Sequence, residues 1–223
     1  LMVAERDAKY SANSTSQEAL WFASGGTQGV APRAYSLLTF TLTAPPKCCS
    51  SVLFLPGLKG SKLKYGNDTL WPPTAISTFS GDIEQLALDE SGGSMNDVKV
   101  DGVLESFYGT PIYSGFTSYL DQLVSDNLIK DWEPLPYDWR LSPERIITDG
   151  VKTNAGVINL ADEVERLASE SYSNKVAIVA HSYGGLVGKA LIQELINRGD
   201  QDLVESFVLV GSPQLGTPQA VAS

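Results

Sequence analysis

Apolar residues gather in three short runs that each have the length and composition of a buried strand. The runs are Ser51–Leu55, Val176–Ala180 and Ser206–Val210, and β-branched residues are frequent in two of them. A short run without polar alternation is typical of a strand that is covered on both faces. We therefore expect these three segments to be strands of one sheet.

Segments with helical periodicity separate these strands. The spacing of apolar residues predicts amphipathic helices over Tyr113–Asp126 and Asn154–Ser171, and Leu186–Asn197 is also compatible with a helix. A short extended piece is expected at Asp131–Pro136. Strands that alternate with helices predict an α/β fold, with a mainly parallel sheet and helices on both faces. The ligand sites of such sheets lie at the C-terminal ends of the strands.

The rest of the chain predicts an appendage and an insertion. Residues 1–45 are either an N-terminal extension or the first strands, with strand-like sequence at Ala19–Ala23 and Ala34–Thr43. Residues 46–223 form the core. Within the core, residues 66–110 are long, polar and irregular, with one short helix expected at Gly81–Leu88, which is typical of a lid or a substrate-binding insertion. The alternative is a mobile surface loop.

The second apolar run ends in a motif with candidate chemistry. Its last residue opens the sequence Ala-His-Ser-Tyr-Gly, residues 180–184, and a helix-compatible stretch follows. A strand, a sharp turn with a central Ser and a helix make a nucleophile elbow, whose tight turn requires small residues at the positions of Ala180 and Gly184. Ser182 would be the nucleophile, and the backbone N–H of Tyr183 would face an oxyanion. The alternative is an ordinary strand-to-helix turn that contains a Ser.

Two further loops follow predicted strands. Pro56–Ser61 carries two glycines after the first run, and such a loop can turn backbone N–H groups toward a ligand. We choose the N–H of Leu58 as the second oxyanion donor, although Pro-Gly also marks a simple turn. Gly211–Pro218 follows the third run. Because strand ends of a parallel sheet meet at one edge, Leu58, Ser182 and Gly211 are expected to lie together.

Composition excludes several classes of partner. The 223 residues carry a net charge of −10 and no basic patch, which argues against nucleic acid and anionic membranes. No apolar run is long enough for a transmembrane segment. A single His and two adjacent cysteines offer no metal-ligand spacing, so we expect no metal and no cofactor. A bond between Cys48 and Cys49 is expected to be strained and absent. Glycosylation triplets at Asn13 and Asn67 weakly favour a secreted location.

Four segments share motifs with one known group of proteins. They are Leu55–Leu63, Leu70–Pro72, Pro136–Leu141 and Ala180–Gly185. In these segments the sequence resembles the lecithin:cholesterol acyltransferase-like branch of the α/β-hydrolases, which includes phospholipase-type and diacylglycerol-acyltransferase members. An esterase that deacylates the inositol of glycosylphosphatidylinositol has a similar elbow, but the segment Pro136–Leu141 argues against it. From its residues alone, that segment is either an Asp–Arg and aromatic brace or a surface loop, and we favour the brace.

The resemblance implies an α/β-hydrolase fold and a serine acyl hydrolase or acyltransferase that acts on lipid or other carboxylic esters. It implies Ser182 as the nucleophile and the N–H groups of Leu58 and Tyr183 as the oxyanion hole. Two positions depart from the family pattern, which mostly has Gly where this chain has Ala180 and Met or Leu where it has Tyr183. We expect Tyr183 to crowd an acyl pocket.

One part of the expected machinery has no candidate in the sequence. The triad of these enzymes runs Ser, then Asp or Glu, then His, and no His follows Ser182. The only His is His181, which we interpret as a packed and hydrogen-bonded residue because neighbouring side chains at a strand end point apart. We therefore expect the chain to be a truncated core, with the acid and the His in a missing C-terminal segment or a second chain. The strand at Phe207–Val210 is then an exposed edge.

Two functions remain open at this point. The first is an ester hydrolase or acyltransferase that is active once the missing groups are present. The second is a non-catalytic module that keeps the scaffold and binds or assembles with a partner chain. Labelling of Ser182 by a fluorophosphonate separates the two, because only an activated serine reacts.

Overall fold

The structure is a computed structural model that describes residues 17–20, 38–41, 49–73 and 82–216. The chain divides into two compact units, Leu1–Lys47 and Cys48–Ser223. In the first unit, β1 (Gln17–Leu20) pairs antiparallel with β2 (Leu38–Thr41). The rest of the expected strand sequence there lies outside the described residues.

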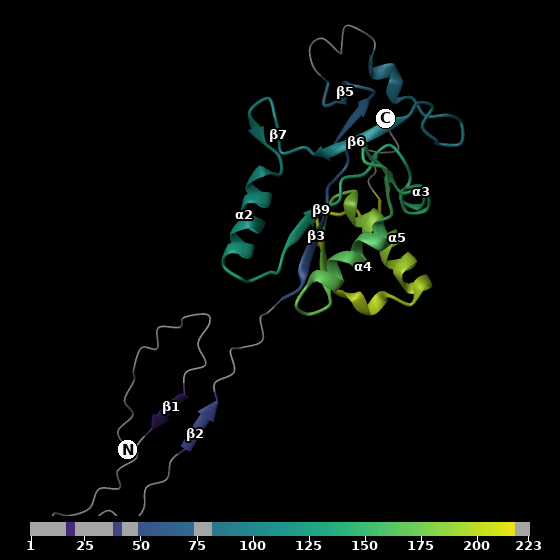
Figure 1. Cartoon of the computed structure of the whole chain (residues 1–223). Coiled ribbons are helices and arrows are strands. Elements are labelled where there is room, and N and C mark those ends of the chain that lie inside the picture. Colours follow the sequence, from purple (N-terminus) through teal and green to yellow (C-terminus); the bar gives the residue numbers. More distant parts are fainter. Residues whose placement is uncertain (1–16, 21–37, 42–48, 74–81, 217–223) are drawn as a thin grey trace, which may run out of the picture. The chain divides into compact units, whose positions relative to one another are not determined.

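A four-stranded parallel sheet forms the centre of the second unit (Figure 1). Its strands, in spatial order, are β9 (Trp132–Pro134), β3 (Ser51–Leu55), β12 (Val176–His181) and β13 (Val204–Val210). The chain passes from β3 to β9 on one side, and then returns to β12 on the other side. The C-terminal ends of β3 and β12 therefore flank a topological switch point, where open α/β sheets bind their ligands.

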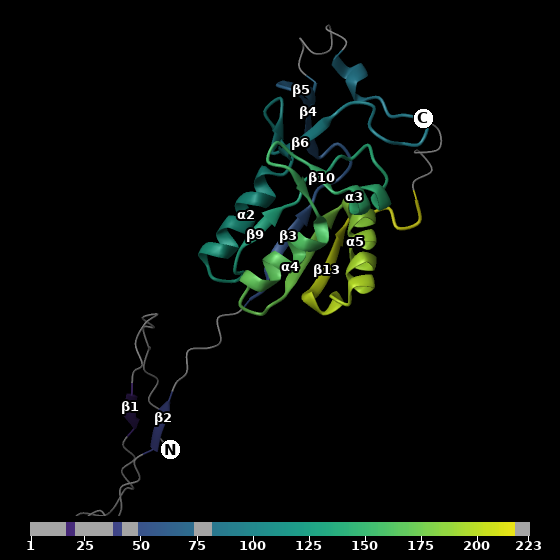
Figure 2. The ribbon, with the colours of Figure 1, turned by 45° about the vertical axis from the view of Figure 1, so that its right-hand side comes forward.

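Helices cover both faces of this sheet (Figure 2). Every residue of β3 is buried, as its unbroken apolar run predicts. Leu53 and Leu55 belong to the main core with apolar residues of α4 and α5, whereas Phe54 packs with Phe116 of α2 in a second cluster. Because successive side chains of a strand point to opposite faces of the sheet, β3 packs against helices on both faces. The expectation of a parallel α/β sheet is confirmed.

The helices agree with the predictions except at one boundary and one omission. They are α2 (Ser114–Ser125), α3 (Pro143–Asp149), α4 (Leu160–Glu170) and α5 (Gly184–Arg198). The prediction that a helix begins at Asn154 is wrong. Asn159 caps α4 by accepting the N–H of Ala161, and the residues before it pair as β11 (Val157–Ile158) with β10 (Val151–Lys152).

The helix α3 escaped sequence analysis although its start carries a clear signal. Ser142 is the N-cap, its hydroxyl accepts the N–H of Arg145, and Pro143 occupies the first turn. Both residue types are favoured at these positions. The helix is short, and its apolar residues Ile146 and Ile147 are too few to show a period.

The interpretation of residues 66–110 as irregular is wrong for much of the described part. A three-stranded antiparallel sheet has the order β5 (Asp68–Trp71), β4 (Ser61–Tyr65) and β6 (Val98–Val103). The short helix expected at Gly81–Leu88 is a 3-10 helix, η1 (Asp82–Leu86). A hairpin of β7 (Ser106–Phe107) and β8 (Thr110–Pro111) follows β6. The alternation of buried Val98 and Val100 with polar residues is the signal that sequence analysis passed over.

The strand β13 lies at an edge of the parallel sheet, because β12 is its one neighbour among the described residues. A 3-10 helix, η2 (Gln201–Leu203), precedes it. Cys49 is disulfide-bonded. The expectation about a bond between Cys48 and Cys49 involves Cys48, which lies outside the described residues. None of the helices in the described ranges is long and apolar enough to cross a membrane.

Candidate active site

Ser182 stands on a turn of unusual backbone conformation between β12 and α5. Its φ of 50° lies in the left-handed region, which is uncommon for a residue with a side chain. Two hydrogen bonds hold the turn: the Ser182 N–H donates to the carbonyl of Val210 at 2.9 Å, and the Gly185 N–H donates to the carbonyl of Ser182 at 3.0 Å. Such strain persists only where the surroundings impose it, and it is characteristic of functional sites.

Small residues flank Ser182 because the neighbouring strand approaches closely. A Cβ on Gly184 would lie 2.5 Å from the carbonyl oxygen of Leu55 and 2.6 Å from that of Pro56. Two positions before the serine, Ala180 is fully buried between the strands that neighbour β12. The steric requirement inferred from the sequence is therefore present in the structure.

The loop after β3 lies against this turn. A Cβ on Gly57 would lie 3.0 Å from the Cβ of Ser182 and 2.8 Å from Nδ1 of His181. The third loop also reaches the elbow, because a Cβ on Gly185 would lie 2.1 Å from Oγ of Ser212. The structure thus brings together the three loops that follow β3, β12 and β13.

Most backbone carbonyl groups of the loop Pro56–Ser61 accept a hydrogen bond. The carbonyl of Pro56 accepts from the Tyr137 hydroxyl, and that of Gly57 accepts from the Gly60 N–H at 2.9 Å. Three more carbonyls have donors on other elements, namely Lys59 with Nε1 of Trp71, Gly60 with the N–H of Leu104 and Ser61 with Nε1 of Trp139. The N–H of Leu58 has no acceptor among the described residues.

Tyr183 contributes its backbone to the elbow and sends its side chain elsewhere. It is the N-cap of the 15-residue helix α5, where free N–H groups and the positive end of the helix dipole gather. Its hydroxyl donates to the carbonyl of Leu141 at 2.8 Å, and its ring lies 6.3 Å from that of Tyr137. Burial, followed by the charge of Glu144, raises the pKa of Tyr183 to about 12. The side chain is thus committed to packing on Tyr137 and Leu141, which speaks against the expected crowding of an acyl pocket.

His181 is hydrogen-bonded away from the nucleophile. Its Nδ1 lies 2.8 Å from the hydroxyl oxygen of Tyr113, and the two rings meet edge to face with centroids 5.7 Å apart. The same hydroxyl accepts the N–H of Gly57 at 2.8 Å. His181 is therefore a packed, hydrogen-bonded residue, as interpreted from the sequence. In the part of the chain that the structure describes, neither its Nδ1 nor any carboxylate hydrogen-bonds Ser182 Oγ.

The segment Tyr137–Arg140 forms the brace that the sequence favoured. Tyr137 is fully buried beneath Pro56, and burial raises the pKa of its hydroxyl far above the usual value. Asp138 and Arg140 form a largely buried ion pair with two hydrogen bonds, of 2.5 and 2.9 Å. Arg140 also donates to the carbonyl of Leu86 and to Oγ of Ser94. One segment thus supports both the loop after β3 and the insertion.

Tyr113 is the site residue that sequence reasoning missed. The helical pattern identified it only as the start of a helix, and it precedes α2 as its N-cap. No local signal distinguishes a tyrosine whose hydroxyl reaches a loop 56 positions earlier in the chain. Trp71 and Trp139 also bond to the loop after β3, and both stand in motifs that the sequence analysis identified. Their rings pack edge to face with centroids 5.4 Å apart.

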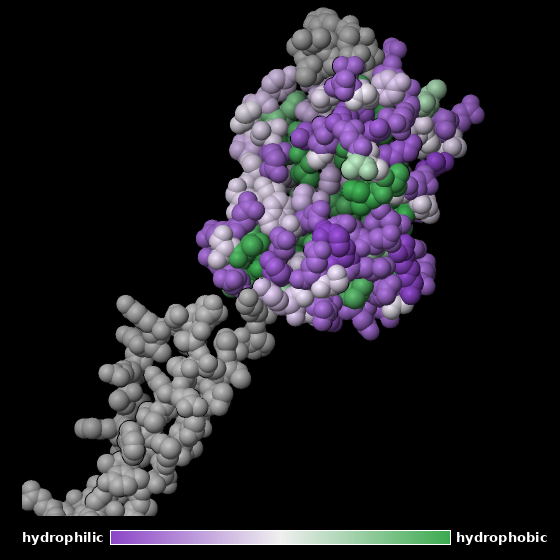
Figure 3. Space-filling model, in the orientation of Figure 1, coloured by the Kyte–Doolittle hydropathy of each residue, from purple (hydrophilic) through white to green (hydrophobic). Residues whose placement is uncertain are grey.

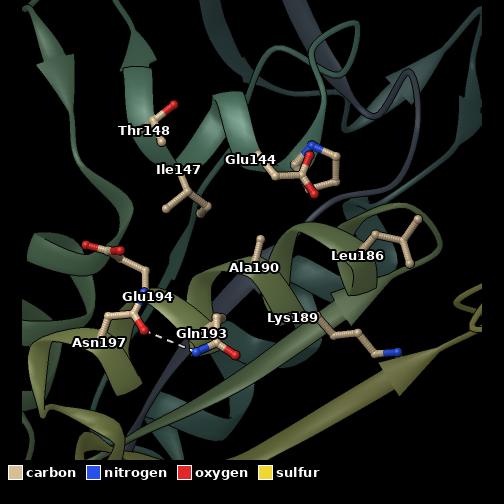
Figure 4. A pocket seen from close by; sticks show the side chains of 10 residues that line it. Glu144, Ile147, Thr148, Leu186, Lys189, Ala190, Gln193, Glu194 and Asn197 are labelled. Carbon is tan, nitrogen blue, oxygen red and sulfur yellow. Dashed lines mark hydrogen bonds between the residues drawn. The ribbon is translucent and has the colours of Figure 1, made fainter.

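The described surface also has a groove that includes neither Ser182 nor the loop after β3. A hollow of about 550 Å³ runs between α3 and α5 and is lined by one face of each helix (Figure 4). Ile147 and Ala190 form part of its apolar wall, and Lys189 and Glu194 stand at its rim (Figure 4). Apolar side chains on the face seen in Figure 3 appear in separate groups rather than one continuous patch. No cluster of three or more metal-ligating side chains exists within the described ranges.

Comparison with known proteins connects this site to a family. The family model described as lecithin:cholesterol acyltransferase matches residues 104–223, which is more than half of the chain. The match includes Tyr113, the brace, the elbow and the loop after β13, but not the loop after β3. A search among curated proteins found no match.

Proposed function

The chain belongs to the lecithin:cholesterol acyltransferase family, and from this premise we propose that it is a serine acyl hydrolase or acyltransferase for lipid or other carboxylic esters. Family membership indicates lipid acyltransferase or phospholipase chemistry. The observation that carries the finer proposal is the left-handed turn that holds Ser182 at the switch point between β3 and β12. The α/β-hydrolase fold, of which the parallel sheet would be the centre, is part of this proposal.

The proposed reaction uses Ser182 as a covalent nucleophile. Its Oγ attacks the carbonyl carbon of the ester and forms a tetrahedral oxyanion, which the N–H groups of Leu58 and Tyr183 would stabilise. The bond to the alcohol then breaks, and the alcohol leaves with the proton that began on Ser182. Water or a second alcohol then attacks the acyl-serine, the bond from Oγ to the acyl carbon breaks, and the proton of the attacking group returns to Ser182 as the acyl group leaves as an acid or a new ester.

Ser182 needs a proton acceptor, and we propose that residues other than these 223 supply it. The only histidine has its Nδ1 engaged by Tyr113 and precedes Ser182 directly. An Asp or Glu and a His from a further segment of the protein or from a second chain would complete the triad. The small-molecule partners, in this proposal, are the ester and the water or alcohol that takes up its acyl group.

Reaction with a fluorophosphonate tests the proposal. The 223-residue chain, alone and in the longer protein, is incubated with the probe and its intact mass is measured. We expect one adduct in the longer protein that disappears in Ser182→Ala, and little or no adduct in the chain alone, because it lacks the proposed proton acceptor. The variant adds no steric conflict at the positive φ, because Ser and Ala share the same Cβ. Ser125→Ala is the matched control, since that exposed hydroxyl bonds only within α2. Lack of any adduct in the longer protein would reject the proposal.

A non-catalytic module is the second candidate, and one observation favours it. The chain has no histidine that is free to serve Ser182, and β13, which has one neighbouring strand in the described part of the chain, presents the exposed side chains of Val208 and Val210. A scaffold of this kind could assemble with a partner chain. This function predicts no adduct in any context together with a stable complex. Turnover that depends on Ser182 excludes it.

A further inference from the structure

We propose that Tyr113 is a positioning residue that ties the loop after β3 to the elbow and thereby holds the Leu58 N–H toward the oxyanion. The inference rests on the proposed function of Ser182 and deepens it. Tyr113 does not touch the reacting atoms in this scheme. It acts through two groups, the N–H of Gly57 and Nδ1 of His181.

The peptide group between Pro56 and Gly57 is held on both sides by tyrosine hydroxyls. Its carbonyl oxygen accepts from Tyr137, and its N–H donates to Tyr113 at 2.8 Å. Both tyrosines are buried, and burial raises the pKa of each hydroxyl, so each keeps its proton. A peptide fixed at both polar atoms cannot rotate without breaking two buried hydrogen bonds. The next peptide, which carries the Leu58 N–H, is fixed through the bond from Gly60 to the Gly57 carbonyl.

The proton arrangement makes Tyr113 a directional link. Its oxygen already accepts from Gly57, so its own proton is best donated to Nδ1 of His181. That donation requires a neutral imidazole with its proton on Nε2. The backbone of Tyr113 is fixed in turn, because the N–H groups of Ile112, Tyr113 and Ser114 all donate to the carbonyl of Glu105.

The spacing of the two loop glycines supports the same assignment. A Cβ on Gly60 would lie 2.9 Å from the Tyr113 hydroxyl, and a Cβ on Gly57 would lie 2.8 Å from Nδ1 of His181. Neither glycine has a positive φ, but a Cβ on Gly60 would also lie 2.8 Å from the Gly57 carbonyl oxygen, so the turn itself has no room for a side chain there. Gly57 and Gly60 together leave room for the Tyr113–His181 pair, and Gly60 also allows the turn.

The test compares the wild-type chain with Tyr113→Phe and with Tyr119→Phe, a matched tyrosine of α2 whose side chain is 56% exposed. Because His181 is the only histidine, long-range proton–nitrogen NMR reports its tautomer without overlap. We expect the Nε2–H form in the wild type and in Tyr119→Phe, and a mixture of tautomers in Tyr113→Phe. We also expect the Gly57 amide to exchange with solvent at least about tenfold faster in Tyr113→Phe.

Labelling of Ser182 by the fluorophosphonate supplies the functional readout. Since small displacements of a catalytic group cost large factors in rate, we expect labelling about tenfold to a hundredfold slower in Tyr113→Phe and unchanged in Tyr119→Phe. Equal labelling rates in wild type and Tyr113→Phe would overturn the inference. These rates are measured in the longer protein, and if its wild type is not labelled at all, the proposed function fails separately. The His181 tautomer and the exchange rate of the Gly57 amide then test the role of Tyr113 alone. If Tyr113→Phe changes neither, Tyr113 does not tie the loop to the elbow.

Discussion

The Cα of Gly184 faces the carbonyl oxygen of Leu55 so closely that a methyl group on it would lie only 2.5 Å from that oxygen. Both partners are backbone atoms, of the elbow helix and of the central strand β3. Neither can rotate aside as a side chain would. The relationship sets how near Ser182 comes to the loop after β3.

Replacement of Gly184 by Ala is therefore expected to destabilise the protein by about 3 kcal/mol or more, because overpacking against backbone has no cheap relief. Gly115→Ala is the matched control. Gly115 is also in the first turn of a helix, but nothing lies within 4 Å of its Cβ position. It should leave stability unchanged or raise it by up to about 1 kcal/mol. Urea denaturation measures both, and equal midpoints for the two variants would contradict the assignment.

Removal of the Tyr183 hydroxyl should affect stability rather than the acyl site. Tyr183→Phe loses the hydrogen bond to the Leu141 carbonyl, which is worth about 1 kcal/mol. The raised pKa adds a pH effect: the stability it contributes is complete below pH 10 and is lost as the pH rises toward about 12. Unfolding at pH 8, 10 and 11 should show a smaller decline in the variant. A large change in the fluorophosphonate labelling rate would instead indicate that Tyr183 faces the substrate.

Loss of Arg140 should both destabilise the protein and release the insertion. Arg140→Ala leaves Asp138 buried without its cation, which costs about 3 to 5 kcal/mol. It also frees the Leu86 carbonyl and the Ser94 hydroxyl, so limited proteolysis should cut near these residues first. Lys152→Ala removes an exposed pair with Asp97 and should cost less than about 1 kcal/mol. Similar losses for the two variants would show that the brace is not buried in solution.

The edge strand β13 should promote association of the chain with itself. Val208 and Val210 are 46% and 49% exposed, and the strand has one open side among the described residues. Val208→Lys places a charge on this edge and should lower the average mass in sedimentation at high concentration. Val157→Lys changes a valine of β11 that is 63% exposed and is the control. Monomeric behaviour of the wild type up to high concentration would refute this prediction.

Local sequence features were sufficient for the strands β3, β12 and β13, for helix α2 and for the turn around Ser182. They failed at α3, which is too short to show a helical period. They also failed at Val157 and Ile158, because these residues pair as a strand with β10 and do not belong to α4. They also failed for the insertion, where turn-like residues outweighed the alternation in β6. The cap of α3 and the alternation of β6 are local signals that sequence analysis passed over, whereas the pairing of β11 with β10 is a contact that a helical periodicity does not report.

The sequence by itself determined that an apolar strand, a small-residue turn with Ser182 and a helix succeed one another, because such preferences act between neighbours in the chain. Only the tertiary structure decided which groups hold the second loop of the site. The Tyr113 hydroxyl reaches Gly57 across 56 positions, and the Tyr137 hydroxyl reaches Pro56 across 81. The physical reason is that a buried hydrogen bond is specified by where folded elements meet, and a sequence pattern carries no record of that meeting.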